Sequence, residues 1–292
     1  MRPFLLPDAL ARELCARLEA PWPATFADVA TLYRRWCRVI PFDTIAKALA
    51  VAEDRPLPGA DASEVVETWL ATGVGGTCWG QVNAFAAVLA AAGIPATAGL
   101  DRMLLPDGEV DFHSVAVITD GDVDHACDFT HVSAKPLPLV PGALGGQGPY
   151  EVGIDGDGAG RLVHWYRNPG HERTRTEGAA TMPRTRYILL STVLDAADVA
   201  AFGVVASAFS GVQARKLYSR RFPDGGFVYG RPTDDGAALT LTTYAGHEQS
   251  TRVIADVDEA FAALGYNEAG RRMAERAGLL QTDGDGSSRY RL

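Results

Sequence analysis

The sequence lacks the features that are typical of proteins that bind nucleic acid or span a membrane. Basic residues are in the minority, with 27 Lys and Arg against 36 Asp and Glu, and the net charge is −9. Because phosphate binding needs a basic surface, this balance argues against nucleic acid as the main partner. No apolar run reaches the roughly 20 residues that span a bilayer, so we expect no membrane association.

Cysteine is also scarce, with four residues in 292 and no regular spacing between them. This pattern does not suit a disulfide framework and fits a reducing compartment. No group of Cys and His has the spacing of a zinc site, so no metal is expected. The N-terminus lacks the apolar core and cleavage site of a signal peptide, and a cytoplasmic location is therefore the expectation.

One of the four cysteines stands in a distinctive segment. Cys78 follows Gly75-Gly76-Thr77 and directly precedes a helical run over 82–92. A cysteine at the start of a helix lies at the positive end of the macrodipole, which favours the thiolate. We predict that Cys78 is a nucleophile. The other cysteines lie in apolar stretches and are expected to be buried packing residues: Cys15, Cys37 and Cys127.

A nucleophilic thiol needs a base and an acid that orients the base, and the chain offers both. His113 and Asp128 lie on two predicted strands that Asp120-Gly121 would join in a type I′ hairpin. In that register they are direct cross-strand partners, with Cβ atoms roughly 4.5–5.5 Å apart. The spacing therefore predicts a Cys78–His113–Asp128 triad.

The other histidines are weaker candidates for the base. His125 alternates onto the face opposite Asp128, and His131 follows the strand, where it is a candidate to line the pocket. The remaining three have no recognisable spacing and are expected at the surface: His164, His171 and His247.

Apolar residues with helical spacing dominate the first third of the chain. The spacing predicts helices over 8–18, 26–36, 63–70 and 82–92. Ser63 is the expected N-cap of the third helix, and Gly93 is the expected C-cap of the fourth. We expect residues 1–95 to form a helical domain that carries the nucleophile.

From residue 96 the apolar pattern changes to a period of two. It predicts strands over 96–105, 113–119, 123–130, 162–166 and 186–190, with a turn at 106–108. The segment 141–160 contains eight glycines and is expected to be a mobile surface loop. We expect residues 96–193 to form a β-rich domain that carries His113 and Asp128.

The last third mixes both patterns. It predicts helices over 195–209, 257–264 and 268–277 and strands over 226–230 and 239–244. We expect residues 194–292 to form an α/β lid. One basic cluster is a candidate to hold the phosphates of coenzyme A or an acidic carrier protein, or is a solvated strand edge: Arg215, Lys216, Arg220 and Arg221.

Taken together, these motifs resemble the arylamine N-acetyltransferase family of the wider transglutaminase-like Cys-His-Asp group. The resemblance rests on Ile40-Pro41-Phe42-Asp43, on Gly75-Gly76-Thr77-Cys78-Trp79 and on the interval from His113 to Asp128. It implies an α+β fold with an N-terminal helical bundle, a central antiparallel β-barrel-like region and a C-terminal α/β lid. Four side chains in or near these motifs are candidates for substrate binding: Phe42, Trp79, Phe129 and His131.

The chain departs from the family pattern around the thiol. Val74 stands where the family usually has Arg, and Asp43 stands where its proline motif usually has Glu. Trp79-Gly80 replaces an aromatic residue followed by Glu, and the bulky stretch 129–132 replaces a glycine-containing segment near the coenzyme site. The chain therefore resembles a divergent member, and the family's substrates do not carry over with the triad.

The predicted activity is acyl transfer through an acyl-Cys78 intermediate, without a cofactor. The acyl thioester is a co-substrate, held either on coenzyme A or on the phosphopantetheine of an acyl or peptidyl carrier protein. The favoured reading is chain release in specialised biosynthesis, by Dieckmann-type cyclisation or amide formation. The alternatives are an arylamine N-acetyltransferase that uses acetyl-coenzyme A, a transglutaminase-like peptidase and a non-catalytic binding protein.

Overall fold

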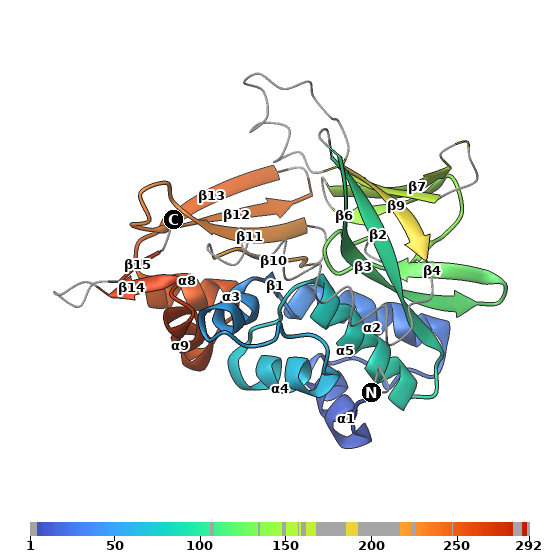
Figure 1. Cartoon of the computed structure of the whole chain (residues 1–292), viewed down its shortest axis with the longest axis horizontal. Coiled ribbons are helices and arrows are strands. Elements are labelled where there is room, and N and C mark those ends of the chain that lie inside the picture. Colours follow the sequence, from blue (N-terminus) through green and yellow to red (C-terminus); the bar gives the residue numbers. More distant parts are fainter. Residues whose placement is uncertain are drawn as a thin grey trace.

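The computed structural model describes most of the chain. The described residues are 5–105, 108–133, 135–147, 150–156, 158, 162–167, 185–191, 217–223, 226–246, 248–282 and 288–290. A layer of helices lies beneath two antiparallel sheets, one of eight strands and one of five (Figure 1). The α+β class expected from the sequence is confirmed.

The helices of the first third are close to their predicted positions. They are α1 Asp8–Arg17, α2 Phe26–Val39, α3 Ile45–Ala52, α4 Ala62–Thr72 and α5 Cys78–Ala91. A capping box of Thr25 and Asp28 begins α2. The N-cap of α4 is Asp61, whose side chain accepts from the backbone N–H of Ser63, so the prediction of Ser63 as the cap was wrong. The short α3 was not predicted.

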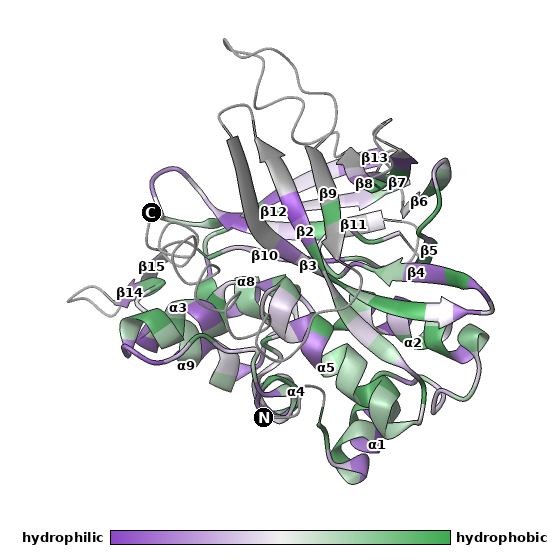
Figure 2. Cartoon of the chain, turned by 45° about the vertical axis from the view of Figure 1, so that its right-hand side comes forward, coloured by the Kyte–Doolittle hydropathy of each residue, from purple (hydrophilic) through white to green (hydrophobic). Residues whose placement is uncertain are grey.

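The buried helix α5 is the centre of the larger core. Nearly every residue of α5 is buried, and much of the helix is hydrophobic in Figure 2. Around it, Phe85 packs with Tyr33, Trp36 and Phe129 at ring-centroid distances of 5.1 to 6.2 Å. This aromatic cluster joins α2, the middle of α5 and the segment after the predicted hairpin.

The eight-stranded sheet has the order β5-β4-β3-β2-β9-β8-β7-β6 and is antiparallel throughout. Within the described residues it is open, because β5 and β6 are edge strands that do not pair, and the barrel-like closure expected from the resemblance is not seen. Its strands are β2 Ala96–Leu105, β3 Gly108–Asp120, β4 Val123–Cys127, β5 Leu137–Pro138, β6 Ala143–Gln147, β7 Tyr150–Gly156, β8 Leu162–Arg167 and β9 Thr185–Ser191.

The hairpin register between β3 and β4 differs from the prediction. Asp120 pairs with Val123, so the two turn residues are Gly121 and Asp122. Gly121 has a positive φ of 60° but Asp122 does not, so the predicted type I′ turn, which needs a positive φ at both central residues, was wrong. The predicted pairing of His113 with Asp128 was therefore wrong by two residues. Since side chains alternate with a period of two, this shift leaves both residues on the same face of the sheet.

The glycine-rich segment 141–160 was also mispredicted as a loop. Its described part forms the strands β6 and β7, which pair from Ala143 with Ile154 to Gln147 with Tyr150. Gly153 shows why glycine is needed there, because a Cβ at this position would lie 2.5 Å from the ring of Trp165 on β8. These glycines allow a bulky neighbouring side chain to cover the strand.

The five-stranded sheet joins the two ends of the chain. Its order is β1-β10-β11-β12-β13, and β1, Phe42–Asp43, comes from the N-terminal third. The other elements of the last third are β10 Ser219–Arg221, β11 Gly226–Pro232, β12 Leu239–Ala245, β13 Glu248–Ile254, α8 Val257–Leu264, α9 Glu268–Arg276, β14 Leu280–Thr282 and β15 Ser288–Tyr290. The predicted helix over 195–209 lies outside the described residues.

The C-terminal elements share a core with the N-terminal third. Ile45 and Leu49 of α3 belong to the same buried cluster as Leu239 of β12 and Phe261 of α8. The division into three domains at residues 95 and 193 stays a prediction. Within the described residues, this cluster packs the C-terminal elements against α3.

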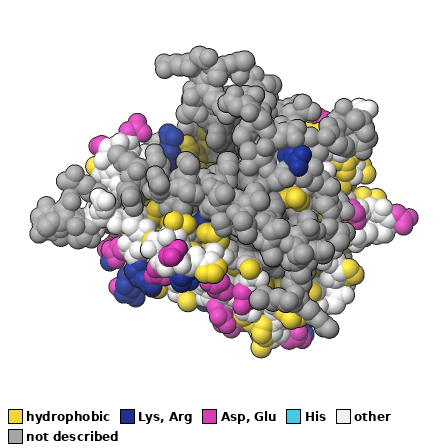
Figure 3. Space-filling model, in the orientation of Figure 1, with side chains coloured by type: hydrophobic (Ala, Val, Ile, Leu, Met, Phe, Trp, Pro, Cys, Tyr) yellow, Lys and Arg dark blue, Asp and Glu magenta, His cyan; other side chains and the backbone are white. Residues whose placement is uncertain are grey.

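The described surface carries mixed charge. Basic and acidic side chains lie close together over the region of α9 on the face seen in Figure 3. Three arginines of α9 are paired, Arg271 with Glu275, Arg272 with Glu268 and Arg276 with Glu53. Among the described helices, none combines the length and apolar character needed to cross a membrane.

Candidate active site

The first residue of α5 is Cys78, and Thr77 is its N-cap. Helix α5 packs against β3, and the thiol at its first residue lies beside this strand, which carries His113. The first N–H groups of a helix have no carbonyl four residues before them, and they concentrate positive potential at this point. The sulfur is buried, with 9% of the residue exposed.

The structure brings Cys78, His113 and Asp128 together. Asp128 Oδ2 lies 2.7 Å from His113 Nε2, and the imidazole is hydrogen-bonded to Cys78. Because Nε2 of His113 bonds to the carboxylate, Nδ1 is the ring nitrogen available for the hydrogen bond with the sulfur of Cys78. His113 and Asp128 are 1% and 2% exposed, so this chain of hydrogen bonds is shielded from water.

Asp128 is held by its own segment and by α2. Its Oδ1 accepts from the backbone N–H groups of Thr130, at 2.7 Å, and His131, at 2.9 Å. The phenol of Tyr33 donates to the backbone carbonyl of Asp128 at 2.7 Å. The carboxylate therefore has a fixed direction although it follows the end of β4.

The charges of the three residues support one another. Burial raises the pKa of Asp128, but the positive charge and hydrogen bond of His113 outweigh it and hold that pKa well below the usual range. Burial lowers the pKa of His113, yet Asp128 and Cys78 together raise it well above its ordinary value. Burial raises the pKa of Cys78, but the hydrogen bond and charge of His113 outweigh it and lower that pKa. The arrangement favours a thiolate beside an imidazolium.

The proline motif holds the loop before the nucleophile. Asp43 Oδ2 accepts from the backbone N–H groups of Gly75, at 2.8 Å, and Gly76, at 3.4 Å. Gln81 donates to the carbonyls of Pro41, at 2.8 Å, and Gly76, at 3.0 Å. A Cβ on Gly75 would lie 2.1 Å from the carbonyl oxygen of Pro41, so only glycine fits this approach.

Solved structures with this architecture exist, although no family model and no curated protein sequence matches the chain. The arylamine N-acetyltransferase of Salmonella typhimurium has 18% identity and a TM-score of 0.69 over 92% of this chain and 98% of its own. That of Mycobacterium marinum, solved in complex with CoA, has 18% identity and a TM-score of 0.65 over 90% and 96%. An arylamine N-acetyltransferase of Bacillus cereus with a Cys-His-Glu triad has 12% identity and a TM-score of 0.67 over 89% and 99%.

The chain has the arylamine N-acetyltransferase fold. At these identities the likeness concerns the fold alone. It supports the resemblance drawn from the motifs, and the low identities are consistent with a divergent sequence.

Within this arylamine N-acetyltransferase fold, Asp43 connects the nucleophile loop to two other parts of the chain. Asp43 is fully buried and binds the backbone N–H of Ile45 in addition to the glycine loop. Tyr266, which precedes α9, is hydrogen-bonded to Asp43 and donates to the hydroxyl of Ser219 on β10 at 2.6 Å. The nucleophile loop is thereby tied to the C-terminal sheet.

A second acid and imidazole lie against the triad, and the sequence did not reveal them. Asp101 is the cross-strand partner of His113, and its Oδ2 lies 4.0 Å from His113 Nε2. His164 Nδ1 lies 3.2 Å from Asp101 Oδ2 and 3.7 Å from Asp128 Oδ2. The expectation that His164 is a surface residue was wrong, since it is 3% exposed. The one local signal was a histidine between Val163 and Trp165 in a strand pattern.

His131 is the third imidazole at the site. It is 3% exposed, and its ring centroid lies 5.1 Å from that of His113. His125, in contrast, lies on β4 with its ring 4.7 Å from Phe26 and away from this group. His171 and His247 fall outside the described residues.

Nitrogen and oxygen atoms from two overlapping sets lie close enough to share a metal ion, one of Asp101, His113 and His164 and one of His113, Asp128 and His131. Four of these five residues already form acid–imidazole hydrogen bonds, His113 with Asp128 and His164 with Asp101.

The remaining substrate-binding candidates have different surroundings. Phe129 is buried in the aromatic cluster with Phe85, and Trp79 belongs to the same core. Phe42 is partly buried, and the guanidinium of Arg220 lies 4.7 Å from its ring centroid. Arg220 is 6% exposed, so it is not a solvated strand edge, whereas Arg215 and Lys216 lie outside the described residues.

Lys47 of α3 is a further buried cation near the thiol. It is 8% exposed; burial lowers its pKa, and the charge of Cys78 partly opposes this shift. No sequence motif pointed to it, and α3 itself was not predicted.

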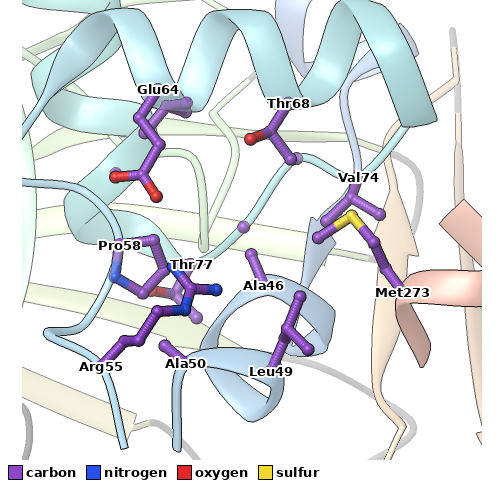
Figure 4. Close-up of a pocket in the computed structure, with 14 residues that line it drawn as sticks. Ala46, Leu49, Ala50, Arg55, Pro58, Glu64, Thr68, Val74, Thr77 and Met273 are labelled. Carbon is purple, nitrogen blue, oxygen red and sulfur yellow. The ribbon is translucent and has the colours of Figure 1, made fainter. Parts of the chain in front are cut away.

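A surface cavity lies beside the nucleophile loop, and no triad residue lines it. Arg55 and Glu64 lie on one side of it and Val74 and Met273 on the other (Figure 4). The loop 75–77 forms part of the wall of this cavity. The cavity is therefore next to the loop that precedes Cys78 and that is hydrogen-bonded to Asp43.

We predict that Cys78 is the thiol that reacts first with iodoacetamide at neutral pH. Its lowered pKa increases the fraction of thiolate, whereas burial raises the pKa of Cys15 to about 11 and raises those of Cys37 and Cys127 as well. His113→Gln should slow Cys78 alkylation about tenfold for each pKa unit regained. Peptide mapping after timed alkylation measures this, and equal labelling of Cys78 and Cys15 would contradict it.

Asp43 should make stability depend on pH in an unusual direction. Burial raises the pKa of Asp43 to about 6, although the N–H groups of Gly75, Ile45 and Gly76 favour the carboxylate. The folded state then holds the proton more tightly than the unfolded state, so this stabilisation is complete below pH 3.8 and is lost as pH rises through about 6. The change is roughly 3 kcal/mol.

The comparison that isolates this effect is with Asp43→Asn, which has no proton to lose. Denaturant unfolding of both proteins between pH 4 and pH 7 should show the free energy of unfolding of the wild type falling relative to that of the variant. Two curves that stay parallel over this range would contradict the assignment.

Proposed function

We propose that this protein transfers acyl groups through a thioester on Cys78. The observation that carries the proposal is the buried hydrogen-bond chain from Asp128 through His113 to Cys78. The thiolate attacks the carbonyl carbon of an acyl thioester, and the imidazolium of His113 gives its proton to the departing thiolate. Asp128 keeps the imidazole in the tautomer that faces the sulfur.

The start of α5 supplies the natural place for the negative oxygen of the tetrahedral intermediate. Cys78 is the first residue of the helix, and its backbone N–H belongs to the group that has no intrahelical acceptor. A donor of this kind beside the nucleophile stabilises an oxyanion as it forms. The backbone N–H of Cys78 is therefore our candidate for one oxyanion donor.

The donor is an acyl thioester, and two carriers are chemically equivalent at the reacting carbon. The Mycobacterium marinum enzyme with this fold was solved with CoA, which supports an acyl-coenzyme A donor. The phosphopantetheine of an acyl or peptidyl carrier protein presents the same thioester. A thiolate nucleophile works in a reducing compartment, and we place the reaction in the cytoplasm.

For the acceptor we favour chain release in specialised biosynthesis, as an amide or by Dieckmann-type ring closure. Two departures from the family support this choice: Asp43, which binds the nucleophile loop, stands where the proline motif usually has Glu, and Thr130 and His131 bring side chains where a glycine-containing stretch is expected. Acetylation of an arylamine from acetyl-coenzyme A is the second candidate, and the shared fold favours it.

The peptidase and binding-protein readings have less support. A transglutaminase-like peptidase would use the same triad, but the proline motif 40–43 that clamps the loop belongs to the arylamine N-acetyltransferase pattern. A binding protein with no activity would not need a buried acid, imidazole and thiol in hydrogen-bond contact. Both remain outcomes that the following experiment distinguishes.

Incubation with an acyl thioester should add one acyl mass to the intact wild-type protein. The adduct should be absent from Cys78→Ala, because no other described cysteine has a partner imidazole within a triad. Intact-protein mass spectrometry measures both. Cys127→Ala is the matched control and should acquire the adduct as the wild type does, since Cys127 is fully buried in the core.

The same assay separates the two candidate functions. Chain release predicts that a long β-ketoacyl thioester gives the adduct and a released cyclic or amide product faster than acetyl-coenzyme A acetylates an arylamine. The reverse order would support the arylamine N-acetyltransferase. An active-site thiol that forms no adduct with either donor would end the acyl-transfer proposal.

A further inference from the structure

A second acid–imidazole pair lies against the pair of the triad. In the triad, Asp128 Oδ2 lies 2.7 Å from Nε2 of His113. In the second pair, Asp101 Oδ2 lies 3.2 Å from Nδ1 of His164. The distances between the pairs are also short, 4.0 Å from Asp101 Oδ2 to His113 Nε2 and 3.7 Å from Asp128 Oδ2 to His164 Nδ1. Two carboxylate oxygens and two ring nitrogens therefore alternate around a closed set of four atoms, which we call the acid–imidazole square.

The strand β2 directs Asp101 into this square. Asp101 is the cross-strand partner of His113, so the two side chains share a face of the sheet. At Asp101, β2 changes register against both of its neighbours, just after this residue against β3 and just before it against β9. Irregularities of this kind change the direction of a side chain and are frequent next to active sites. His164 reaches Asp101 from β8, although β9 lies between the two strands.

Burial makes an ionised Asp101 unfavourable unless a positive charge lies beside it. Asp101 is 0% exposed and His164 is 3% exposed. Among the described residues, Oδ1 of Asp101 has no hydrogen-bond partner, and its Oδ2 is bonded to His164. A buried carboxylate with an unsatisfied oxygen costs free energy, so packing alone does not favour aspartate at this position. The imidazolium of His113 does favour it.

The ring nitrogens of the square have the donors that the two carboxylates need. An ionised carboxylate only accepts hydrogen bonds, so Nδ1 of His164 carries a proton when it bonds to Asp101. Burial raises the pKa of Asp128, and charge on the neighbouring imidazoles, His164 among them, lowers it. Nε2 of His113 has a carboxylate oxygen on each side, at 2.7 and 4.0 Å. A negative charge at such a distance favours the protonated form of an imidazole.

We propose that Asp101 and His164 are positioning residues of the triad. Asp101 stabilises the protonated imidazole of His113, and His164 keeps Asp101 ionised by donating a hydrogen bond from Nδ1. This proposal rests on the acyl transfer proposed above and concerns its first half-reaction. In that step the protonated His113 gives its proton to the departing thiolate of the donor, while the sulfur of Cys78 bonds to the acyl carbon.

One substitution can remove the charge of Asp101 and leave the triad intact. The charged and titratable groups around His113 in the described part of the chain are Cys78 of α5, Asp101 of β2, Asp128 and His131 after β4, and His164 of β8, with Arg220 of β10 beside His131. Two of the anionic groups, Cys78 and Asp128, belong to the triad. Asp101 is the third, and Asp101→Asn removes its charge with almost no change of shape.

The pH dependence of adduct formation tests this role. Quenched-flow mass spectrometry with an acyl thioester gives the rate at which Cys78 is acylated, and this rate should fall at high pH as His113 loses its proton. Asp101→Asn should move that fall to lower pH by about one unit or more, because the imidazolium has lost a negative neighbour. His164→Phe should move it in the same direction, because a buried Asp101 without its hydrogen bond takes up a proton. The double variant should shift no further than the larger single shift, since both substitutions remove the same charge.

An NMR titration measures the same property without acyl transfer. With ¹⁵N-labelled histidine, the resonance of His113 is the one that His113→Gln removes, and its pKa should fall in both single variants. Asp122→Asn, which removes a charge from the exposed turn between β3 and β4, is the matched control and should leave the titration unchanged.

A His113 transition that stays in place in Asp101→Asn or in His164→Phe would overturn the proposal. It would do so even if the activity falls, because a loss of rate without a shift in pH indicates a packing role only. If the His113 transition shifts as expected but the wild type forms no adduct, the acyl transfer is overturned and the effect of Asp101 on His113 stands.

Discussion

The hydrogen bond between His113 Nε2 and Asp128 Oδ2 is the interaction on which the site depends. It lies out of contact with water and holds the carboxylate of one strand end against the imidazole of the neighbouring strand. A buried carboxylate without a partner destabilises the folded state. The Asp128 carboxylate is therefore tolerated only while His113 is present to bond to it. The thiolate of Cys78 is then the third charge in a row that alternates in sign.

The second constraint is the short strand β1, which connects three parts of the molecule. Through Phe42 and Asp43 it pairs with β10 of the C-terminal sheet, and the carboxylate of Asp43 binds the loop before Cys78. Two contacts therefore position the first turn of α5: the loop that precedes it and the hydrogen bond between Cys78 and His113. Both ends of the chain contribute to the placement of one sulfur atom.

Local patterns were enough to find the main helices and strands, and α8 begins and ends where its apolar spacing predicted. The turn before β4 was harder, because Asp120-Gly121 and Gly121-Asp122 are both acceptable two-residue turns and only the structure distinguishes them. The prediction that His113 contacts Asp128 was nevertheless correct, because a register shift of two residues leaves both side chains on the same face of the sheet. His164 could not be found, because it reaches Asp128 from a strand that is not adjacent to β3 or β4.

The most direct test of the central claim is an ultraviolet titration of the Cys78 thiolate, taken as the difference between wild type and Cys78→Ser. We expect the thiolate to be present below the ordinary thiol pKa of 9.0, and Asp128→Asn or His113→Gln to move the transition to higher pH. A Cys78 that titrates at 9.0 or above in the wild type, or that is unaffected by either substitution, would contradict it.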